Sequence, residues 1–377
     1  MSEIPQANRT INNELTCAKC GAILKFKPGT LSLVCDHCGQ ENEIAKPDAH
    51  NRIDENDLEE LLARGVEQDE KMEVATVNCN ACGAVVTMDP HVISDKCPFC
   101  ASNLVVTGGT TSSLHRPQYL LPFYIDNTKA RENFKGWIGS LWFAPNDLAG
   151  YARNADELNG MYLPYWTFDV NTYTDYTGQR GDAYYETEHY TTQEDGKTVT
   201  RTRQVRKIRW YPASGNVGNT FDDVLVEATK SLNLDKLREL EPWDLKKLIP
   251  YNDKFLSGFR TETYRVDIRT AYGKAKERMY PTIEATIRRD IGGDEQIISH
   301  VSIDYESPTY KHVLLPVWIS AYRYHGKVYQ ILVNARTGEV QGERPYSAIK
   351  IAFAVFCVLL IIAIIYFINQ YNQGHYR

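Results

Sequence analysis

Eight of the nine cysteines fall into two groups with the same spacing. Each group reads C-x2-C-x14-C-x2-C, and the second begins 62 residues after the first. Gly-Ala follows the second cysteine in both groups, and Pro28 corresponds to Pro90. The simplest explanation is an internal duplication of a four-cysteine unit. The eight residues are Cys17, Cys20, Cys35, Cys38, Cys79, Cys82, Cys97 and Cys100.

This spacing is typical of closed tetrahedral metal sites. Two cysteines separated by two residues lie on one tight turn, and a hairpin of about a dozen residues brings a second such turn opposite. Gly21, Gly39 and Gly83 each follow a cysteine pair, where positive φ lets backbone N–H groups face the thiolates. Ala101 takes the fourth such position. We predict two zinc ribbons, each holding one structural zinc ion.

Other chemistries of the cysteines are less favoured. The chain opens without a secretory signal, which disfavours disulfides. The CPFC segment at 97–100 resembles a redox motif, but it is better explained as half of a metal site. Iron fits the same ligands as zinc. A catalytic zinc ion needs an open coordination position, and four thiolates leave none. We therefore expect the ribbons to present a binding surface without catalysing a reaction.

The charge of the N-terminal part argues against nucleic acid as a partner. Residues 1–107 carry 17 carboxylates and nine lysines or arginines, and each zinc ion with four thiolates adds −2, giving about −12 in total. Binding to a phosphate backbone requires clustered positive charge. Ribbon 1 has only Lys19, Lys25 and Lys27 as a basic strip. A nucleic-acid-binding role linked to transcription or replication therefore stays an alternative.

Between the ribbons, residues 54–73 combine acidity with a helical apolar pattern. Leu58, Leu61, Leu62 and Val66 recur at helical spacing. We predict an acidic connector helix over 54–73, with Asp54 or Asn56 as its N-cap.

The C-terminal region contains an uncharged segment, 351–368, that reads IAFAVFCVLLIIAIIYFI. Eighteen helical residues span roughly 27 Å, close to the hydrocarbon thickness of a bilayer. Cys357 lies inside the segment, so we exclude it as a metal ligand. Arg336, Arg344 and Lys350 precede the segment and only Arg377 follows it, which places the N-terminal bulk in the cytoplasm. We predict a single-pass, tail-anchored protein of the cytoplasmic membrane, in contact with lipid through this helix.

These features divide the chain into six parts. They are zinc ribbon 1 (1–46), an acidic connector helix (47–76), zinc ribbon 2 (77–107), a linker (108–117), an α+β cytoplasmic domain (118–346) and the transmembrane anchor with a short tail (347–377).

The domain over 118–346 is predicted to be α+β and mainly antiparallel. Leu-Pro-aromatic phrases at 121–124, 163–166 and 315–318 are expected to begin buried strands, where a first-position proline is tolerated. Helices are expected at 129–137, 146–153, 232–248 and 266–289; the last contains Pro281 and ends at Gly292-Gly293. Turns at 325–326 and 334–338 predict a closing meander.

A long hairpin is predicted around Asp195-Gly196. With this turn, Glu188 faces Arg203 and Asp182 faces Arg209. The basic run at 201–210 is therefore expected to form cross-strand ion pairs, in preference to a patch that faces lipid or a partner.

The sequence contains no familiar catalytic motif. GxxxxGK[ST], HExxH and GxSxG are absent, and no two of the nine histidines have ligand spacing on a convincing helix. Asp222-Asp223 is the one tempting carboxylate pair, and a turn at a strand start explains it better. We predict a non-enzymatic protein, with an uncharacterised enzyme in the α+β domain as an alternative.

Several phrases accompany the two CxxCGA ribbons and CPFC: YLPYWTFDV (162–170), RWYPASG (209–215), FDDVLV (221–226), EPWDL (241–245) and KHVLLPVWISAYRY (311–324). Together they resemble a bacterial family of membrane-anchored proteins with paired transcription factor IIB-type zinc ribbons. The resemblance covers nearly the whole chain and implies association with SPFH-domain and phage-shock-protein-A-like partners in membrane-stress response. Some members are labelled primosomal helicase-like, but this chain lacks a helicase ATP site. The function implied is a membrane-anchored adaptor.

Overall fold

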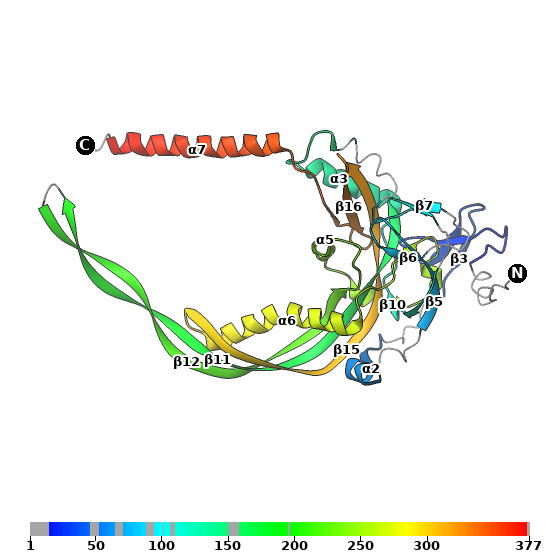
Figure 1. Cartoon of the computed structure of the whole chain (residues 1–377), viewed down its shortest axis with the longest axis horizontal. Helices are drawn as coiled ribbons and strands as arrows, with labels where there is room; N and C mark the ends of the chain where they lie inside the picture. Colours follow the sequence, from blue (N-terminus) through cyan, green and yellow to red (C-terminus); the bar gives the residue numbers. More distant parts are fainter. Residues whose placement is uncertain are drawn as a thin grey trace.

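The computed structural model describes residues 15–45, 53–64, 71–87, 94–100, 102–105, 110–148, 150, 158–194 and 197–374. Within these ranges the chain forms one nine-stranded sheet, three small sheets, helices on the large sheet and a separate C-terminal helix (Figure 1). Most strand pairs are antiparallel, so the predicted α+β class is confirmed.

The strands are β1 (Leu24–Phe26), β2 (Ser32–Cys35), β3 (Glu41–Glu43), β4 (Asn56–Asp57), β5 (Lys71–Asn78), β6 (Val85–Thr87), β7 (Ser94–Lys96), β8 (Asn103–Val105), β9 (Thr110–His115), β10 (Tyr119–Leu120), β11 (Asn159–Glu194), β12 (Lys197–Glu227), β13 (Ile249–Pro250), β14 (Arg260–Thr261), β15 (Glu295–Tyr324), β16 (Lys327–Asn334) and β17 (Val340–Gly342). The α-helices are α2 (Leu58–Arg64), α3 (Asn127–Ser140), α5 (Leu234–Arg238), α6 (Ile268–Ile291) and α7 (Ala348–Gly374). Two 3-10 helices are η3 (Leu245–Lys247) and η4 (Asp253–Phe255).

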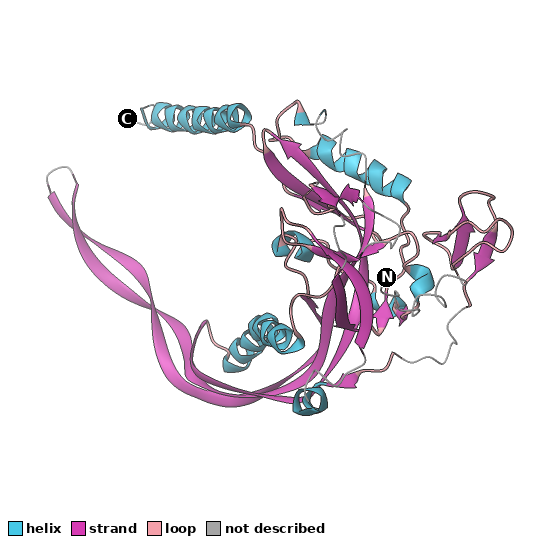
Figure 2. Ribbon diagram, turned by 45° about the vertical axis from the view of Figure 1, so that its right-hand side comes forward, coloured by secondary structure: helices cyan, strands magenta, loops and turns pink. Residues whose placement is uncertain are grey.

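Three long strands, in the order β12-β11-β15, form the spine of the large sheet. β15 pairs with residues 159–181 of β11. Its first residue, Glu295, lies opposite Gly181. Beyond Gly181 only β11 and β12 continue, and we call residues 182–194 and 197–209 the arm. Thirteen residues at about 3.3 Å each extend the arm by roughly 40 Å, and Figures 1 and 2 show it projecting far from the body.

The register of the arm agrees with the predicted hairpin. Glu194 pairs with Lys197, Glu188 with Arg203, and Asp182 with Arg209. The turn residues 195–196 themselves lie outside the described part of the chain. The predicted meander is also confirmed, because β15, β16 and β17 follow one another in antiparallel order.

The Leu-Pro phrases do not begin strands, so that prediction was wrong. Residues 121–124 follow β10, while Pro164 and Pro316 lie inside β11 and β15. The carbonyl oxygens of these two prolines accept from Ala228 and Ala335, residues just beyond the ends of β12 and β16. In an extended strand the N–H and C=O of one residue point to the same side. The N–H that proline lacks would therefore point where each neighbouring strand has already ended.

Helix α6 forms close to the predicted place because its sequence supplies both ends and an apolar face. The Asp267 carboxylate accepts the backbone N–H of Thr270, and Gly292 ends the helix with a φ of 67°. The buried residues recur at helical spacing and pack against β11, β12 and β15 in one core cluster: Ile268, Ala271, Ala275, Met279, Ile283, Ile287 and Ile291.

The other helix predictions had mixed outcomes. Helix α3 confirms the one at 129–137, and Asp126 is its N-cap. The helix predicted over 232–248 is wrong: α5 ends at Arg238, because Pro242 disfavours helical backbone at the residue before it, and η3 follows as a short 3-10 helix. Of the helix predicted at 146–153, residues 149 and 151–153 lie outside the described residues.

The segments around ribbon 2 also differ from prediction. Within the described residues the connector helix is α2, which begins after Asp57. The Asp57 carboxylate accepts the N–H of Glu60, so Asp57 is the N-cap and the prediction of Asp54 or Asn56 was wrong. Val66 lies outside the described residues, and from Lys71 the chain is strand β5, which is rich in β-branched residues. Part of the predicted linker, residues 110–115, is strand β9, which pairs with β5.

Candidate metal centres

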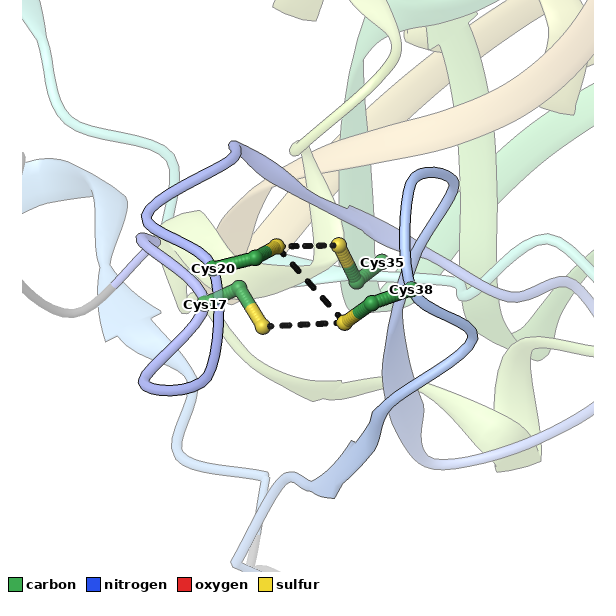
Figure 3. A group of neighbouring side chains, drawn as sticks. All are labelled: Cys17, Cys20, Cys35 and Cys38. Carbon is green, nitrogen blue, oxygen red and sulfur yellow. Dashed lines mark hydrogen bonds between the residues drawn. The ribbon is translucent and has the colours of Figure 1, made fainter.

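The sulfur atoms of Cys17, Cys20, Cys35 and Cys38 converge at one end of the first small sheet, and we call this group centre 1. Figure 3 shows the side chains pointing toward one another from two facing turns. Cys17 Sγ lies 3.6 Å from Cys38 Sγ, and Cys20 Sγ lies 3.4 Å from Cys35 Sγ. Cys79, Cys82, Cys97 and Cys100 form centre 2 in the same way, with Sγ separations of 3.6 Å for Cys79–Cys100 and 3.7 Å for Cys82–Cys97.

These separations fit four thiolates around one metal ion. A Zn–S bond of about 2.3 Å and a tetrahedral angle place two ligand sulfurs roughly 3.8 Å apart, whereas a disulfide requires about 2.05 Å. In each centre all four ligand atoms lie within 4.8 Å of one another. The sequence therefore predicted correctly which cysteines come together, and both groups could bind a metal ion such as zinc.

The local backbone explains why the thiols converge. In three of the turns the glycine after the second cysteine has a φ of 71° to 73°, at Gly21, Gly39 and Gly83. Its N–H donates to the carbonyl of the first cysteine of the pair. The first cysteine in turn donates its N–H to the residue after this glycine, for example Cys17 to Ala22. A side chain larger than glycine's would be strained at this φ. Ala101, in the fourth turn, lies outside the described residues.

Backbone N–H groups also prepare thiols for metal binding. Hydrogen bonds from the backbone of Lys19 and Cys20 lower the pKa of Cys17 to about 7. A hydrogen bond from the backbone of Cys38 lowers the pKa of Cys35. Burial acts in the opposite direction on Cys97, whose pKa it raises. The thiolate is the form that binds a metal, so these backbone hydrogen bonds favour the metal-binding form of Cys17 and Cys35.

Ribbon 1 is packed onto the body. Leu24, Phe26, Leu33, Cys17 and Cys35 belong to one buried cluster with residues of the large sheet, such as Leu314 and Trp318. The N–H of Phe26 donates to the Ser257 carbonyl at 3.0 Å, and the Ser257 hydroxyl donates to the Leu24 carbonyl. The Phe26 ring lies 5.1 Å from that of Phe255. The ribbon is therefore part of the core.

Ribbon 2 is packed in an equivalent manner. Cys79, Cys97, Cys100, Val86 and Phe99 share a buried cluster with β11, β15 and β16. The Gln330 side-chain amide donates to the Phe99 carbonyl at 2.9 Å. Arg265 donates to the Gly83 carbonyl at 2.8 Å. Among the ligands, Cys20 and Cys82 are exposed, so each centre lies at the surface of its ribbon while its base is buried.

A buried carboxylate, Glu262, lies where ribbon 2 meets the sheet. Its backbone forms a β-bridge with Val86, and its Oε1 accepts hydrogen bonds from the hydroxyls of Thr229 at 2.8 Å and Ser231 at 2.5 Å. Within the described part of the chain Oε2 has no hydrogen-bond partner. Burial raises the pKa of Glu262 to about 7.

A second polar cluster surrounds Lys311, which sequence reasoning missed. The buried ammonium lies 2.9 Å from carboxylate oxygens of both Asp169 and Asp223, and 3.1 Å from Glu55. Burial raises the pKa of Asp169, and the hydrogen bond from Asp169 lowers that of Glu55. Asp222 completes a carboxylate group with metal-ligand spacing, but Lys311 already supplies the positive charge there. The cluster fastens the segment before α2 to β15.

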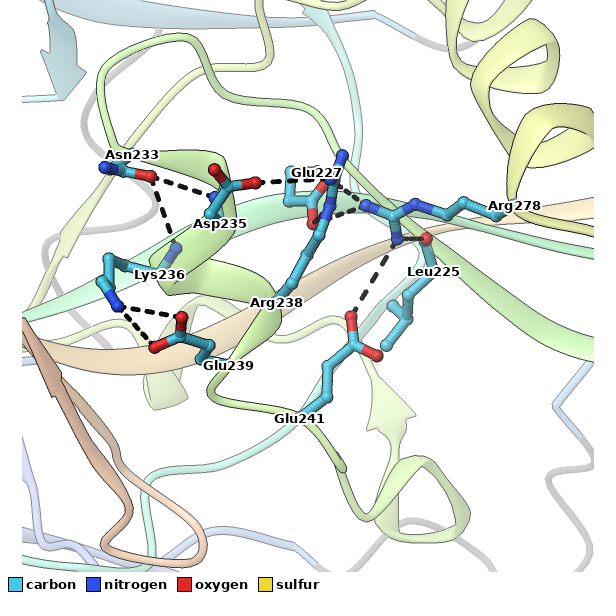
Figure 4. Close-up of polar contacts among 9 residues, drawn as sticks. All are labelled: Leu225, Glu227, Asn233, Asp235, Lys236, Arg238, Glu239, Glu241 and Arg278. Carbon is cyan, nitrogen blue, oxygen red and sulfur yellow. Dashed lines mark hydrogen bonds and ion pairs between the residues drawn. The ribbon is translucent and has the colours of Figure 1, made fainter. Parts of the chain in front are cut away.

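Glu227 forms a further buried ion pair beside α5 and α6. Figure 4 shows the guanidinium of Arg278 facing both oxygens of Glu227, with Arg238 and Glu241 at the margin. The Arg278–Glu227 contacts are 2.5 and 2.6 Å, and Arg238 lies 3.5 Å away from the same carboxylate. Arg278 also donates to the Leu225 carbonyl. This saturated arrangement holds α6 against β12.

The arm carries the ion pairs that the sequence predicted. Arg203 lies 3.0 Å from Glu188, and Lys207 lies 2.6 Å from Glu186. Asp182 pairs with Arg180 and not with Arg209, whose guanidinium lies over the ring of Tyr184. Among the described strands, none pairs with the outer edge of β12, or with β11 beyond Gly181 on the side of β15.

Helix α7 is long and apolar enough to cross a membrane. The candidate span is Ala348–Asn369, with a mean hydropathy of 3.2, and none of the most hydrophobic stretch is buried against the protein. Arg377, which the orientation argument used, lies outside the described residues. The body contacts the start of α7 through two hydrogen bonds, from Ser347 N–H to the Phe143 carbonyl and from Lys350 Nζ to the Ala144 carbonyl.

These features define an α+β protein with two four-cysteine centres and one apolar C-terminal helix. The chain is a distant homologue of the uncharacterized protein YdjG of Bacillus subtilis (strain 168). The two are 24% identical over 337 residues, which cover 89% of this chain and 91% of the relative. No protein-family model and no solved structure matches the chain.

Proposed function

We propose that the protein is a membrane-anchored zinc-ribbon adaptor. Helix α7 anchors it, with the bulk of the chain in the cytoplasm, and partner proteins gather on the cytoplasmic face. Zinc at both centres has a structural role, because four thiolates complete its coordination. The exposed apolar surface of α7 and the sulfur geometry of the centres support the two parts of this proposal.

The arm is the feature that best supports a role as an adaptor. It extends roughly 40 Å from the body as a two-stranded ribbon, at about 3.3 Å per residue, and its outer backbone groups have no partner strand among the described residues. Such edges pair with an extended segment of another protein. The arm carries six lysines or arginines on 197–209 and four carboxylates on 182–194. Its net charge is therefore positive, so we expect carboxylates in a partner segment added beside β12. The family resemblance implies an SPFH-domain protein as the partner, together with a phage-shock-protein-A-like one in membrane stress.

The test is capture of partners from detergent-solubilised membranes. Glu186 and Val205 are opposite each other in the ladder, so replacing 187–204 by Asn-Gly shortens the arm and keeps a two-residue turn. We expect the shortened protein to stay in the membrane and keep its zinc but to lose the SPFH-domain protein. Ile23→Ser changes an exposed residue of ribbon 1 and is the control.

Two outcomes would contradict this proposal. Capture that survives shortening of the arm but is lost in Ile23→Ser would move the docking site to ribbon 1. Salt-sensitive binding of the purified full chain to DNA or RNA, without capture of a protein, would favour the nucleic-acid alternative.

A further inference from the structure

The loop that follows α3 presents two neighbouring aromatic side chains to solvent. Trp142 is 62% exposed and Phe143 is 37% exposed. Their rings contact each other edge to face, with centroids 4.9 Å apart. Neighbouring exposed apolar side chains mark a candidate contact with a membrane or another molecule when their surroundings agree.

The loop is held rigidly in this arrangement. Leu141, Ala144 and Leu148 flank the two aromatic residues and are buried in the same core cluster as α3. Ala144 N–H donates to the Leu141 carbonyl at 3.0 Å, and Trp142 N–H donates to the Ser140 carbonyl at 2.9 Å. The exposure of Trp142 and Phe143 therefore follows from a loop whose other apolar residues are fixed in the core.

The position of the loop indicates what covers it. The Phe143 carbonyl accepts the N–H of Ser347, the residue before α7, at 2.8 Å. The Ala144 carbonyl accepts from Lys350, in the first turn of α7, also at 2.8 Å. A bilayer that surrounds α7 begins at this turn, so the loop lies at the depth of the headgroups. Tryptophan is enriched at this depth because its ring is apolar and its N–H is polar.

Other side chains at the base of α7 have the same character. Tyr346 is 61% exposed and Ile349 is 83% exposed. The guanidinium of Arg344 lies 5.5 Å from the centre of the Tyr346 ring. Aromatic and basic residues next to a spanning helix favour the anionic headgroups of the cytoplasmic leaflet.

This placement does not depend on the angle between α7 and the body. Figure 1 shows α7 and the arm extending toward the same side of the molecule. The arm carries charged side chains that hydrocarbon excludes, such as Arg203 and Lys207. An α7 that spans a bilayer must therefore point away from the arm. The pivot is the segment bound to Phe143 and Ala144, so the loop stays at the membrane surface.

We propose that residues 141–147 form a second membrane contact, in which Trp142 and Phe143 enter the interfacial layer of the leaflet where α7 begins. This proposal rests on the proposed function, because it needs α7 to span the bilayer. The contact fixes how the body lies on the membrane, which a single helix with a pivot does not.

The experiment uses the full chain reconstituted in vesicles of phosphatidylcholine and phosphatidylglycerol. Part of the phosphatidylcholine carries bromine on its acyl chains, which quenches tryptophan fluorescence on contact. We expect quenching in the wild type, a loss of at least half of it in Trp142→Phe, and no loss in the control Trp210→Phe. Trp210 is an exposed residue next to the arm. Lipid is the only other component, so a protein partner cannot produce the effect.

Flotation of the same vesicles separates this proposal from the anchor. Protein that floats with the vesicles while Trp142→Phe keeps the full wild-type quenching contradicts the loop contact and leaves the anchor intact. Quenching that disappears in Trp210→Phe instead assigns the membrane contact to the base of the arm and also overturns the proposal. Full-length protein that does not float with vesicles contradicts the anchor itself.

Discussion

Single residues far apart in the sequence make the strongest electrostatic contacts of this protein. Lys311 on β15 meets Asp169 on β11, Asp223 on β12 and Glu55 before β4. The sequence drew attention to Asp222-Asp223, but nothing local indicates that Lys311 lies beside them. That meeting depends on the register of three long strands and on a bulge at Asp169. The cysteines were predictable because their spacing alone determines the site.

Replacing Lys311 with methionine is expected to destabilise the fold strongly. Three carboxylates, of which Glu55 and Asp223 are partly exposed, would then lie together without a cation. Breaking a fully buried ion pair costs about 3–5 kcal/mol, and this value is the upper end of the expected loss. Urea unfolding of the full chain in detergent measures the change. Lys327→Met, at the exposed first residue of β16, should change the stability by less than about 0.5 kcal/mol. Equal effects of the two substitutions would contradict the role of the cluster.

Glu262 predicts a pH dependence of stability near neutrality. Its pKa of about 7 in the folded protein exceeds the value of about 4.3 expected in the unfolded chain. The folded state thus retains a proton that the unfolded state has lost, so stability falls as pH rises through 7. Between pH 6 and 8.5 the loss should be about 1–2 kcal/mol, and it should be absent in Glu262→Gln. The test is to measure the free energy of unfolding of the wild type and of Glu262→Gln across this pH range. Parallel plots of stability against pH for the two proteins would contradict the prediction.

At the scale of elements, a helix or strand was predicted correctly where signals within one segment determine it, and missed where pairing between distant segments does. The hairpin register, α6 and the apolar α7 follow from turn residues, capping residues and periodicity within one segment. The course of β11 and β15 through Pro164 and Pro316 does not, because it depends on where neighbouring strands end. Likewise, β9 pairs with β5 although its composition is typical of a linker.

Deletion of 348–377 should release the protein from the membrane fraction. The apolar stretch of α7 contributes no surface to the core, so the body is expected to fold without it. Fractionation of cells that express both forms measures the release. In intact cells, protease added from outside should cut nothing before Lys350, and permeabilised cells are the control. Cleavage of the ribbons from outside would reverse the predicted orientation.

At the scale of the whole molecule, both ribbons belong to the cores that also hold the large sheet together. Cys35 is buried with the first core cluster and Cys97 with the second. The acidic segment between them is therefore not a tether for two free modules. The packing of the ribbons against the sheet could not be predicted from the sequence. The contacts of Phe26 with Ser257 and of Phe99 with Gln330 join residues more than 200 positions apart.

Removal of the metal should consequently weaken the entire body. We expect elemental analysis to find two zinc ions per chain and a chelator to lower the unfolding temperature of the whole protein. Cys35→Ser should remove one ion and cost several kcal/mol, whereas Cys357→Ser should change neither value. A red-brown iron chromophore, or fewer than two ions, would contradict the zinc assignment. Loss of structure confined to one ribbon would contradict the shared core.

The continuity of β11 gives the molecule a mechanical property. One strand of 36 residues runs from beneath both ribbons to the tip of the arm. Tension applied along the arm would load many ladder hydrogen bonds in shear at once, so the strands resist separation. A sideways push at the tip would instead act as a lever, with its fulcrum near Gly181, where β15 stops supporting the hairpin. A force applied at the tip would thus be transmitted through β11 to the base of both four-cysteine ribbons.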